Sequence, residues 1–205
     1  LIGTLNSMRG MEQVMMDIYD RPEWLKQVME FMTQGTLWMI RDCEKRGLIE
    51  LNNGSQYIGS GGVGYTDQLP LGDFDGKVRL KDCWGHATMQ SATFLSPRMQ
   101  YEFVLQYQAR LLDEFGLNCF GCCEVLDHEK FRYVKENVKN LRRVSVSPFT
   151  DIRIAAEELG DRYIYSWKHN PSQILGESFD EEAIASSIKE GVRVAGKCNM
   201  EVILK

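Results

Sequence analysis

Apolar residues recur along the first part of the chain at helical spacing. Residues 11–20 predict a short helix, and Pro22 with acidic neighbours predicts the start of a second helix that runs to about Arg46 and is closed by Gly47. Several large apolar side chains of the second helix fall roughly on one face: Trp24, Val28, Phe31, Met32, Trp38 and Met39. This periodicity predicts a stripe that packs into the core.

Further along, short apolar runs alternate with helical patterns. We expect strands at 48–53, 81–86, 117–122, 143–147, 163–167 and 200–204, and helices at 96–116, 129–137, 151–159 and 180–195. Residues 54–80 are glycine-rich and lack periodicity, which indicates a functional loop or an excursion over the mouth of a barrel. Repetition of strand and helix predicts an α/β protein with a parallel sheet.

Six strands are two fewer than a (β/α)8 TIM barrel has, and such barrels usually need about 250 residues. We therefore expect residues 1–205 to be the C-terminal portion of a single barrel domain, with about six βα units, lacking the first two units and the final helix. Alone, such a chain should be unstable or should self-associate, because its edges are unpaired. An open doubly wound sheet is the alternative, although no G-x-G-x-x-G motif joins a strand to a helix.

Composition and charge narrow the class of protein. The 205 residues are 43% hydrophobic and 26% charged, with a formal net charge of −5 and no concentrated basic segment. These values predict a soluble globular protein that binds a small molecule, with neither nucleic acid nor a membrane as partner. The six cysteines include the adjacent pair Cys122 and Cys123, which favours free thiols in a reducing cytoplasm.

Three thiols and a carboxylate follow one another in the run Asn118–Glu124, at the end of a predicted strand. Strand alternation would place Cys122 and Glu124 on one face and Cys123 on the other, unless the backbone turns there. Thiolate, carboxylate and imidazole all bind zinc, so Cys122, Glu124, Cys123 and His128 are the candidate metal ligands. The alternative is that these thiols pack as small apolar groups.

The three histidines all come at or just after predicted strand ends, and in a barrel those ends form one rim. We take His86, His169 and Lys168 as candidate catalytic residues. Asn53, Trp84, Ser147 and Trp167 are candidate substrate-binding residues, although a core position for either tryptophan is an equal alternative. We expect the residues at this rim to border one cavity: His86, Cys122, Glu124, His128, Ser147, Trp167 and His169.

Several segments together resemble the uroporphyrinogen decarboxylase superfamily. They are Met15–Glu23, Phe94–Pro97 followed by Tyr101–Tyr107, and Leu159–Arg162 leading to His169-Asn170-Pro171. Gly121–Glu124 with Asn140–Pro148 is similar to one branch of that superfamily. The similarity spans nearly the whole chain and implies a (β/α)8 barrel.

The superfamily includes porphyrinogen decarboxylases without a cofactor and zinc-dependent methyltransferases that use a corrinoid or a thiol. The methyltransferases have a His-x-Cys pair where this chain has Cys122-Cys123-Glu124. The resemblance thus implies zinc, a corrinoid as methyl carrier and a corrinoid protein as partner. The leading hypothesis is zinc-assisted methyl transfer. The alternatives are decarboxylation of a porphyrinogen or another polycarboxylate, and a non-catalytic barrel that binds a tetrapyrrole or corrinoid.

Overall fold

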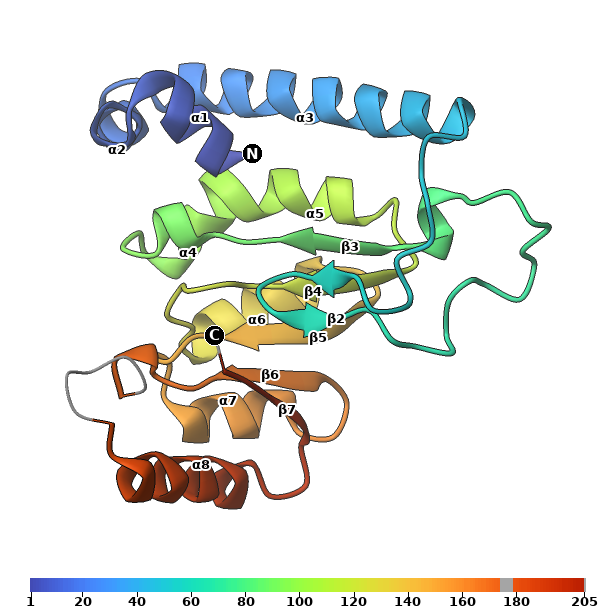
Figure 1. Cartoon of the computed structure of the whole chain (residues 1–205). Helices are drawn as coiled ribbons and strands as arrows, with labels where there is room; N and C mark the ends of the chain where they lie inside the picture. The colour runs from blue at the N-terminus through green and yellow to red at the C-terminus, as the bar shows by residue number, and fades with distance from the viewer. Residues whose placement is uncertain (174–178, 205) are drawn as a thin grey trace.

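The computed structural model describes residues 1–173 and 179–204, and it opens with three helices (Figure 1). These are α1 (Ile2–Arg9), α2 (Met11–Asp20) and α3 (Pro22–Lys45). Helix α3 starts at Pro22, and the chain leaves it through Gly47, whose φ of 66° is typical of a helix end. The predicted helices α2 and α3 are confirmed, whereas α1 was not predicted. No helix in the described part of the chain is long and apolar enough to cross a membrane.

The prediction of which face of α3 is buried was mostly wrong. The buried residues are Leu25, Met29, Thr33 and Leu37. Of the predicted stripe, Phe31 is 79% exposed and Trp38 is 71% exposed, and only Val28 and Met32 pack partly against the core. Helix α3 carries apolar residues on two opposite faces, so its own periodicity could not decide which one packs.

The centre of the molecule is a five-stranded parallel sheet. Its strands are β3 (Trp84–Ala87), β4 (Leu117–Phe120), β5 (Leu141–Val146), β6 (Ile164–Lys168) and β7 (Asn199–Ile203). Their order in the sheet is the order of the chain, with every neighbouring pair parallel. A doubly wound sheet would reverse its order at a switch point. The predicted parallel α/β architecture is confirmed, and within the described residues the five strands do not close into a barrel.

Helices connect the strands much as the sequence predicts. They are α4 (Pro97–Gln100), a π-helical turn (Tyr101–Leu105), α5 (Gln106–Leu112), α6 (His128–Asn137), α7 (Ile152–Leu159) and α8 (Glu181–Ala195), with short 3-10 turns at Leu80–Asp82, Gln90–Ala92 and Pro171–Gln173. Side chains of Ser96, Asp127, Asp151 and Asp180 cap four of these helices by accepting bonds from backbone N–H groups. These local signals are why the helix starts were predictable.

The two faces of the sheet are buried in different ways. On one face, apolar strand residues such as Phe120, Val144 and Tyr165 pack against the helices. On the other face, Trp84 and Cys119 pack against residues of the long segment between α3 and β3. Both faces are therefore covered, as a parallel sheet requires.

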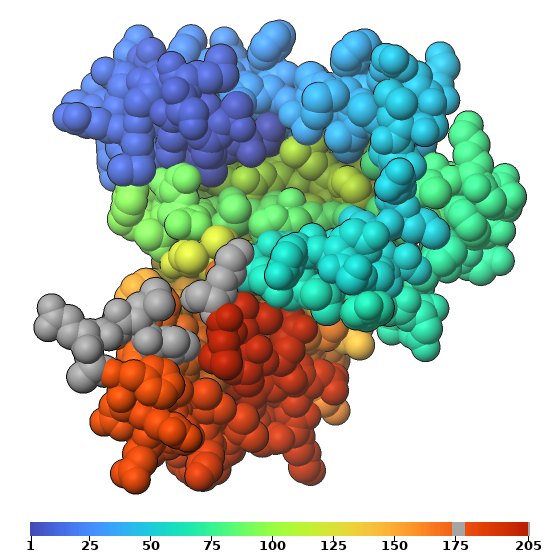
Figure 2. All heavy atoms as spheres, viewed as in Figure 1, coloured from blue at the N-terminus to red at the C-terminus, as the bar shows by residue number. Residues whose placement is uncertain are grey.

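We call the face of the sheet that carries Trp84 and Cys119 the inner face. It is covered by a small hairpin, β1 (Tyr57–Ile58) and β2 (Gly62–Val63), which lies in the predicted glycine-rich segment. A Cβ at Gly59 would lie 2.7 Å from Cys119 Sγ on β4, and one at Gly61 would lie 2.6 Å from the Ile203 side chain on β7. Because two residues of one tight turn, with only Ser60 between them, reach strands β4 and β7, the sheet must curve around the hairpin. Figure 2 shows this segment lying against the end of the chain.

The predicted strand at 48–53 is not a strand, but its residues do approach the edge of β3. The Asn52 side chain accepts from the Trp84 N–H at 2.8 Å and donates to the Trp84 carbonyl at 3.0 Å. The Cys83 thiol donates to the Glu50 carbonyl at 3.4 Å. A side-chain amide thus takes the place of a backbone ladder, so regular strand structure does not form.

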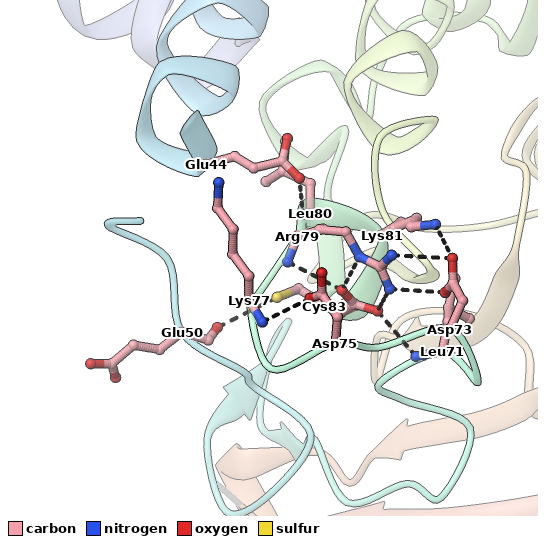
Figure 3. A network of polar contacts seen from close by, with 11 residues as sticks. Glu44, Glu50, Leu71, Asp73, Asp75, Lys77, Arg79, Leu80, Lys81 and Cys83 are labelled. Carbon is pink, nitrogen blue, oxygen red and sulfur yellow. Dashed lines mark hydrogen bonds and ion pairs between the residues drawn. The ribbon is translucent and has the colours of Figure 1, made fainter. Parts of the chain in front are cut away.

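A polar network fixes the amino end of β3 (Figure 3). The Arg79 guanidinium bonds the carboxylates of Asp73 and the fully buried Asp82. Glu44 of α3 accepts from the Leu80 N–H at 2.9 Å. The network lies at the end of β3 opposite to the carboxyl ends of the strands, so its role is to hold the start of the sheet against α3.

Candidate functional site

Two adjacent thiols come together just beyond the end of β4. The strand ends at Phe120, two residues earlier than predicted, and Gly121 follows with a φ of 100°. A Cβ at Gly121 would lie 2.6 Å from the Ser145 carbonyl oxygen, so this turn requires glycine. The chain bends at Cys122 and Cys123, and their Sγ atoms lie 3.5 Å apart. The backbone turn therefore replaces the strand alternation that would have separated them.

Lys168, the last residue of β6, brings a positive charge to this thiol pair. Its Nζ donates to the Cys122 carbonyl at 2.6 Å and lies 3.7 Å from Cys122 Sγ and 3.8 Å from Cys123 Sγ. The side chain is 9% exposed, so the charge acts where water screens it little. Strands β4 and β6 both flank β5, and their carboxyl ends meet at the same end of the sheet.

The hairpin and β3 complete the surroundings of the thiols. The Cys122 thiol donates to Ser60 Oγ at 3.2 Å, and the His86 Nε2 lies 3.1 Å from the Gly121 carbonyl oxygen. Both thiols are half-buried. The pKa of Cys123 is raised above the ordinary thiol value by burial and by the hydrogen bond with the Cys122 thiol, and the Lys168 charge offsets this only in part. We call Cys122, Cys123, Lys168, Ser60 and His86 the thiol site.

Through its carboxylate, Glu124 bonds the segment after β3 and the backbone of the turn itself. Its carboxylate is 1% exposed and accepts hydrogen bonds from the Thr88 hydroxyl at 3.0 Å and from the N–H groups of Met89 and Cys122, both at 2.7 Å. Such bonds to a buried carboxylate are strong. Glu124 therefore braces the turn that carries the thiols against the segment after β3.

The other two predicted histidines lie apart from the thiol site. His128 begins α6, is more than half exposed and bonds Glu158 of α7 through Nδ1 at 2.6 Å. His169 follows β6 at the same end of the sheet as Cys122, but it is buried and its Nε2 lies 3.0 Å from Ser187 Oγ of α8. The predicted rim residues thus do not border one shared cavity.

The predicted substrate-binding residues have structural contacts. Trp84 is buried on the inner face and donates to the Gly64 carbonyl at 3.0 Å. Trp167 packs in the core between the sheet and the outer helices. Asn53 donates to the Leu69 carbonyl at 2.7 Å, and the buried Ser147 hydroxyl lies 3.4 Å from that of Thr150. None of the four is among the contacts of the thiol site.

Two further residues matter here that the sequence did not single out, Ser60 and Thr88. Ser60 lies in the glycine-rich turn of the hairpin, and only the packing of that hairpin inside the curved sheet brings it to Cys122. Thr88 follows β3 directly, so its position after a predicted strand was the signal available for it.

Other cysteines of the sheet differ from the thiol pair. Burial raises the pKa of Cys119 to about 12 and that of Cys83 to about 11. Both side chains are buried in the interior, whereas Cys122 and Cys123 are only half-buried, so Cys119 and Cys83 are packing groups. Within residues 1–173 and 179–204, no group of three or more His, Cys, Asp or Glu side chains is arranged to hold a metal ion.

No family model, curated protein or solved structure matches this chain.

Proposed function

We propose that this chain carries the reaction centre of an enzyme that transfers a methyl group to or from a thiol or a corrinoid. The observation that supports the proposal is the position of the Lys168 ammonium, within 3.8 Å of both the Cys122 and the Cys123 sulfur atoms. It lies at the carboxyl ends of parallel strands, where enzymes with βα architecture keep their catalytic groups. The resemblance to the uroporphyrinogen decarboxylase superfamily supplies the reaction class.

Methyl transfer to a thiol forms a sulfur–carbon bond, breaks the bond between the methyl group and its donor, and releases the thiol proton. A nearby cation attracts the negative charge that Cys122 and Cys123 would carry as metal-binding thiolates. Lys168 supplies this cation, and its bond to the Cys122 carbonyl fixes its place. Ser60 accepts from the Cys122 thiol and orients it.

The two thiols also suit a soft divalent metal. Two thiolates on a tetrahedral zinc ion, each at about 2.3 Å, lie roughly 3.8 Å apart, and the Cys122 and Cys123 sulfur atoms are 3.5 Å apart. In this proposal these two residues would hold zinc in place of the Cys122 and Glu124 pair expected from strand alternation. The described residues place no third His, Cys, Asp or Glu ligand beside them. When bound, zinc supplies Lewis-acid activation of a substrate thiol. Glu124 already accepts from three donors, and His128 bonds Glu158.

Metal analysis and an activity assay on the full-length protein test the proposal. We expect about one equivalent of zinc, lost in both Cys122→Ala and Cys123→Ala because each removes one of few protein ligands. Cys198→Ala, which lies before β7 at the opposite end of the sheet, is the control and should retain zinc. We expect demethylation of methylcobalamin with a small thiol as acceptor to disappear in the first two variants only. Full metal content and activity in both variants would refute the proposal.

Decarboxylation of a polycarboxylate is the second candidate, and Lys168 is the observation that favours it. A buried ammonium at this end of the sheet could bind a substrate carboxylate and stabilise negative charge during carbon dioxide loss. The two functions differ in their dependence on sulfur. Carbon dioxide release from a porphyrinogen that survives Cys122→Ala but is lost in Lys168→Met would favour decarboxylation.

A further inference from the structure

We propose that Cys122 and Cys123 form a reversible disulfide with each other, and that this disulfide switches off the thiol site. The effect on activity rests on the proposed function, whereas formation of the bond does not. The two sulfur atoms are already 3.5 Å apart, and both side chains are half-buried rather than enclosed. Because the two thiols are half-buried, a small molecule can reach them, and the oxidant in this proposal is a low-molecular-weight disulfide.

Closing the bond distorts the peptide group between the two residues, because consecutive Cα atoms lie about 3.8 Å apart whereas most disulfides span about 4.4–6.8 Å. A disulfide sulfur–sulfur bond is about 2.05 Å long, so the two atoms must approach by about 1.5 Å. The thiols lie in a bend beyond the end of β4, where no strand ladder fixes the chain. The backbone of Cys122 bonds side chains rather than a neighbouring strand, its N–H the Glu124 carboxylate and its carbonyl Lys168 Nζ, so the sheet stays intact when the bond closes.

Neither thiol has another cysteine as a competing partner. Cys119 is fully buried on the inner face of β4, and Cys83 is buried at the amino end of β3. Cys198 precedes β7 at the amino end of the sheet and donates to the Ala156 carbonyl, while Cys43 lies on α3. Within the described residues, the thiol site therefore has one possible internal disulfide.

The oxidation proceeds by two exchanges. One thiolate of the pair attacks a sulfur of the oxidised disulfide, forming a mixed disulfide and releasing one small thiolate. The neighbouring thiolate then attacks the protein sulfur of the mixed disulfide and displaces the second small thiolate. The pair loses two electrons and two protons, and the small disulfide is reduced to two thiols. Lys168, in reach of both sulfur atoms, stabilises each attacking thiolate in turn.

The closed form should be easy to reduce. A bond between adjacent residues closes a small ring that departs from relaxed disulfide geometry, and strained disulfides belong to the labile, regulatory kind. Closing it removes both thiolates at once, and with them the zinc ligands of the proposed reaction. Reduction restores them.

The test treats the full-length protein, first freed of metal with a chelator, with oxidised glutathione and follows the products by mass spectrometry of the intact protein and of its peptides. We expect a mass loss of about 2 Da, for two hydrogens, in a peptide that contains Cys122 and Cys123, reversed by dithiothreitol. Cys122→Ser and Cys123→Ser should instead keep a single glutathione adduct. Cys198→Ser, the control, should form the internal bond as the wild type does.

Lys168→Met tests the role of the ammonium. We expect internal disulfide formation to slow by about ten-fold at neutral pH, because the attacking thiolate loses its cation. The conservative Lys168→Arg variant should restore much of the rate. An unchanged rate in Lys168→Met would remove the role given to Lys168.

Two outcomes separate this inference from the proposed function. Stable glutathione adducts on both wild-type thiols, or no loss of hydrogen at all, would overturn the disulfide even if methyl transfer is found. Disulfide formation in a protein that transfers no methyl group would support the disulfide and refute the proposed function.

Discussion

The side-chain amide of Asn52 bonds both backbone groups of Trp84, accepting from its N–H at 2.8 Å and donating to its carbonyl at 3.0 Å. Trp84 opens β3, the strand at one edge of the sheet. The pair of bonds imitates what a neighbouring parallel strand would supply at this position. Asn52 therefore protects an edge that would otherwise expose unpaired backbone groups.

Asn52→Ala should destabilise the protein, because it removes both bonds from a buried residue. We expect the free energy of unfolding to fall by about 1–3 kcal/mol, the usual cost of leaving buried polar groups unpaired. Asn52→Asp keeps the acceptor for the Trp84 N–H and should lie between the wild type and Asn52→Ala. Urea denaturation measures all three proteins. Equal stability of Asn52→Ala and the wild type would show that water replaces the amide without cost.

Glu124→Gln should destabilise the turn that carries the thiols. The amide of glutamine offers one oxygen where the carboxylate offers two, and its NH2 group opposes the N–H groups of Met89 and Cys122. We expect the free energy of unfolding to fall by about 2 kcal/mol or more, since hydrogen bonds to a charged group are at stake. Glu136→Gln, on the exposed side of α6, is the matched control and should have little effect.

Gly59→Ala should disturb the hairpin inside the curved sheet. Gly59 has a φ of 75°, and the new Cβ would lie 2.7 Å from Cys119 Sγ and 3.1 Å from the His86 ring. We expect a loss of about 1–3 kcal/mol in the free energy of unfolding from backbone strain and steric overlap. Gly72→Ala is the control, because nothing lies within 4 Å of its Cβ position. It should change stability by less than about 0.5 kcal/mol.

The pH dependence of the contact between α6 and α7 follows from His128. Its hydrogen bond to Glu158 raises the pKa of His128 above the ordinary value of 6.5. Because the pKa of His128 is higher in the folded than in the unfolded protein, the bond between protonated His128 and Glu158 stabilises the fold fully below pH 6.5. This stabilisation is lost as the pH rises through the folded-state pKa. An NMR titration should show the pKa of His128 falling toward about 6.5 in Glu158→Gln.

Glu129→Gln is the control for this titration, because Glu129 neighbours His128 in α6 and pairs instead with Arg132. It should leave the pKa of His128 nearly unchanged. A drop of equal size in both variants would assign the shift to general negative charge rather than to the bond with Glu158.

The sequence alone determined the order and type of most elements. Local signals decided these: Pro22 at a helix start, Asp151 and Asp180 as caps, and Gly160 after a helix. They act within a few residues, so a single chain displays them. The same reasoning predicted a parallel sheet and selected the run that contains Cys122, Cys123 and Glu124.

Only the tertiary structure decided what those residues face. Period-two alternation predicted that Cys122 and Glu124 share a side, but the turn at Gly121 ends the strand and pairs Cys122 with Cys123 instead. Lys168 reaches the thiols because β6 lies two strands away in a parallel sheet, a contact 46 residues apart in the chain. The outward position of Phe31 was likewise decided by packing, since α3 has two apolar faces and only one of them packs against α5 and the π-helical turn before it. Sequence periodicity describes one element at a time, whereas a site is built from contacts between elements.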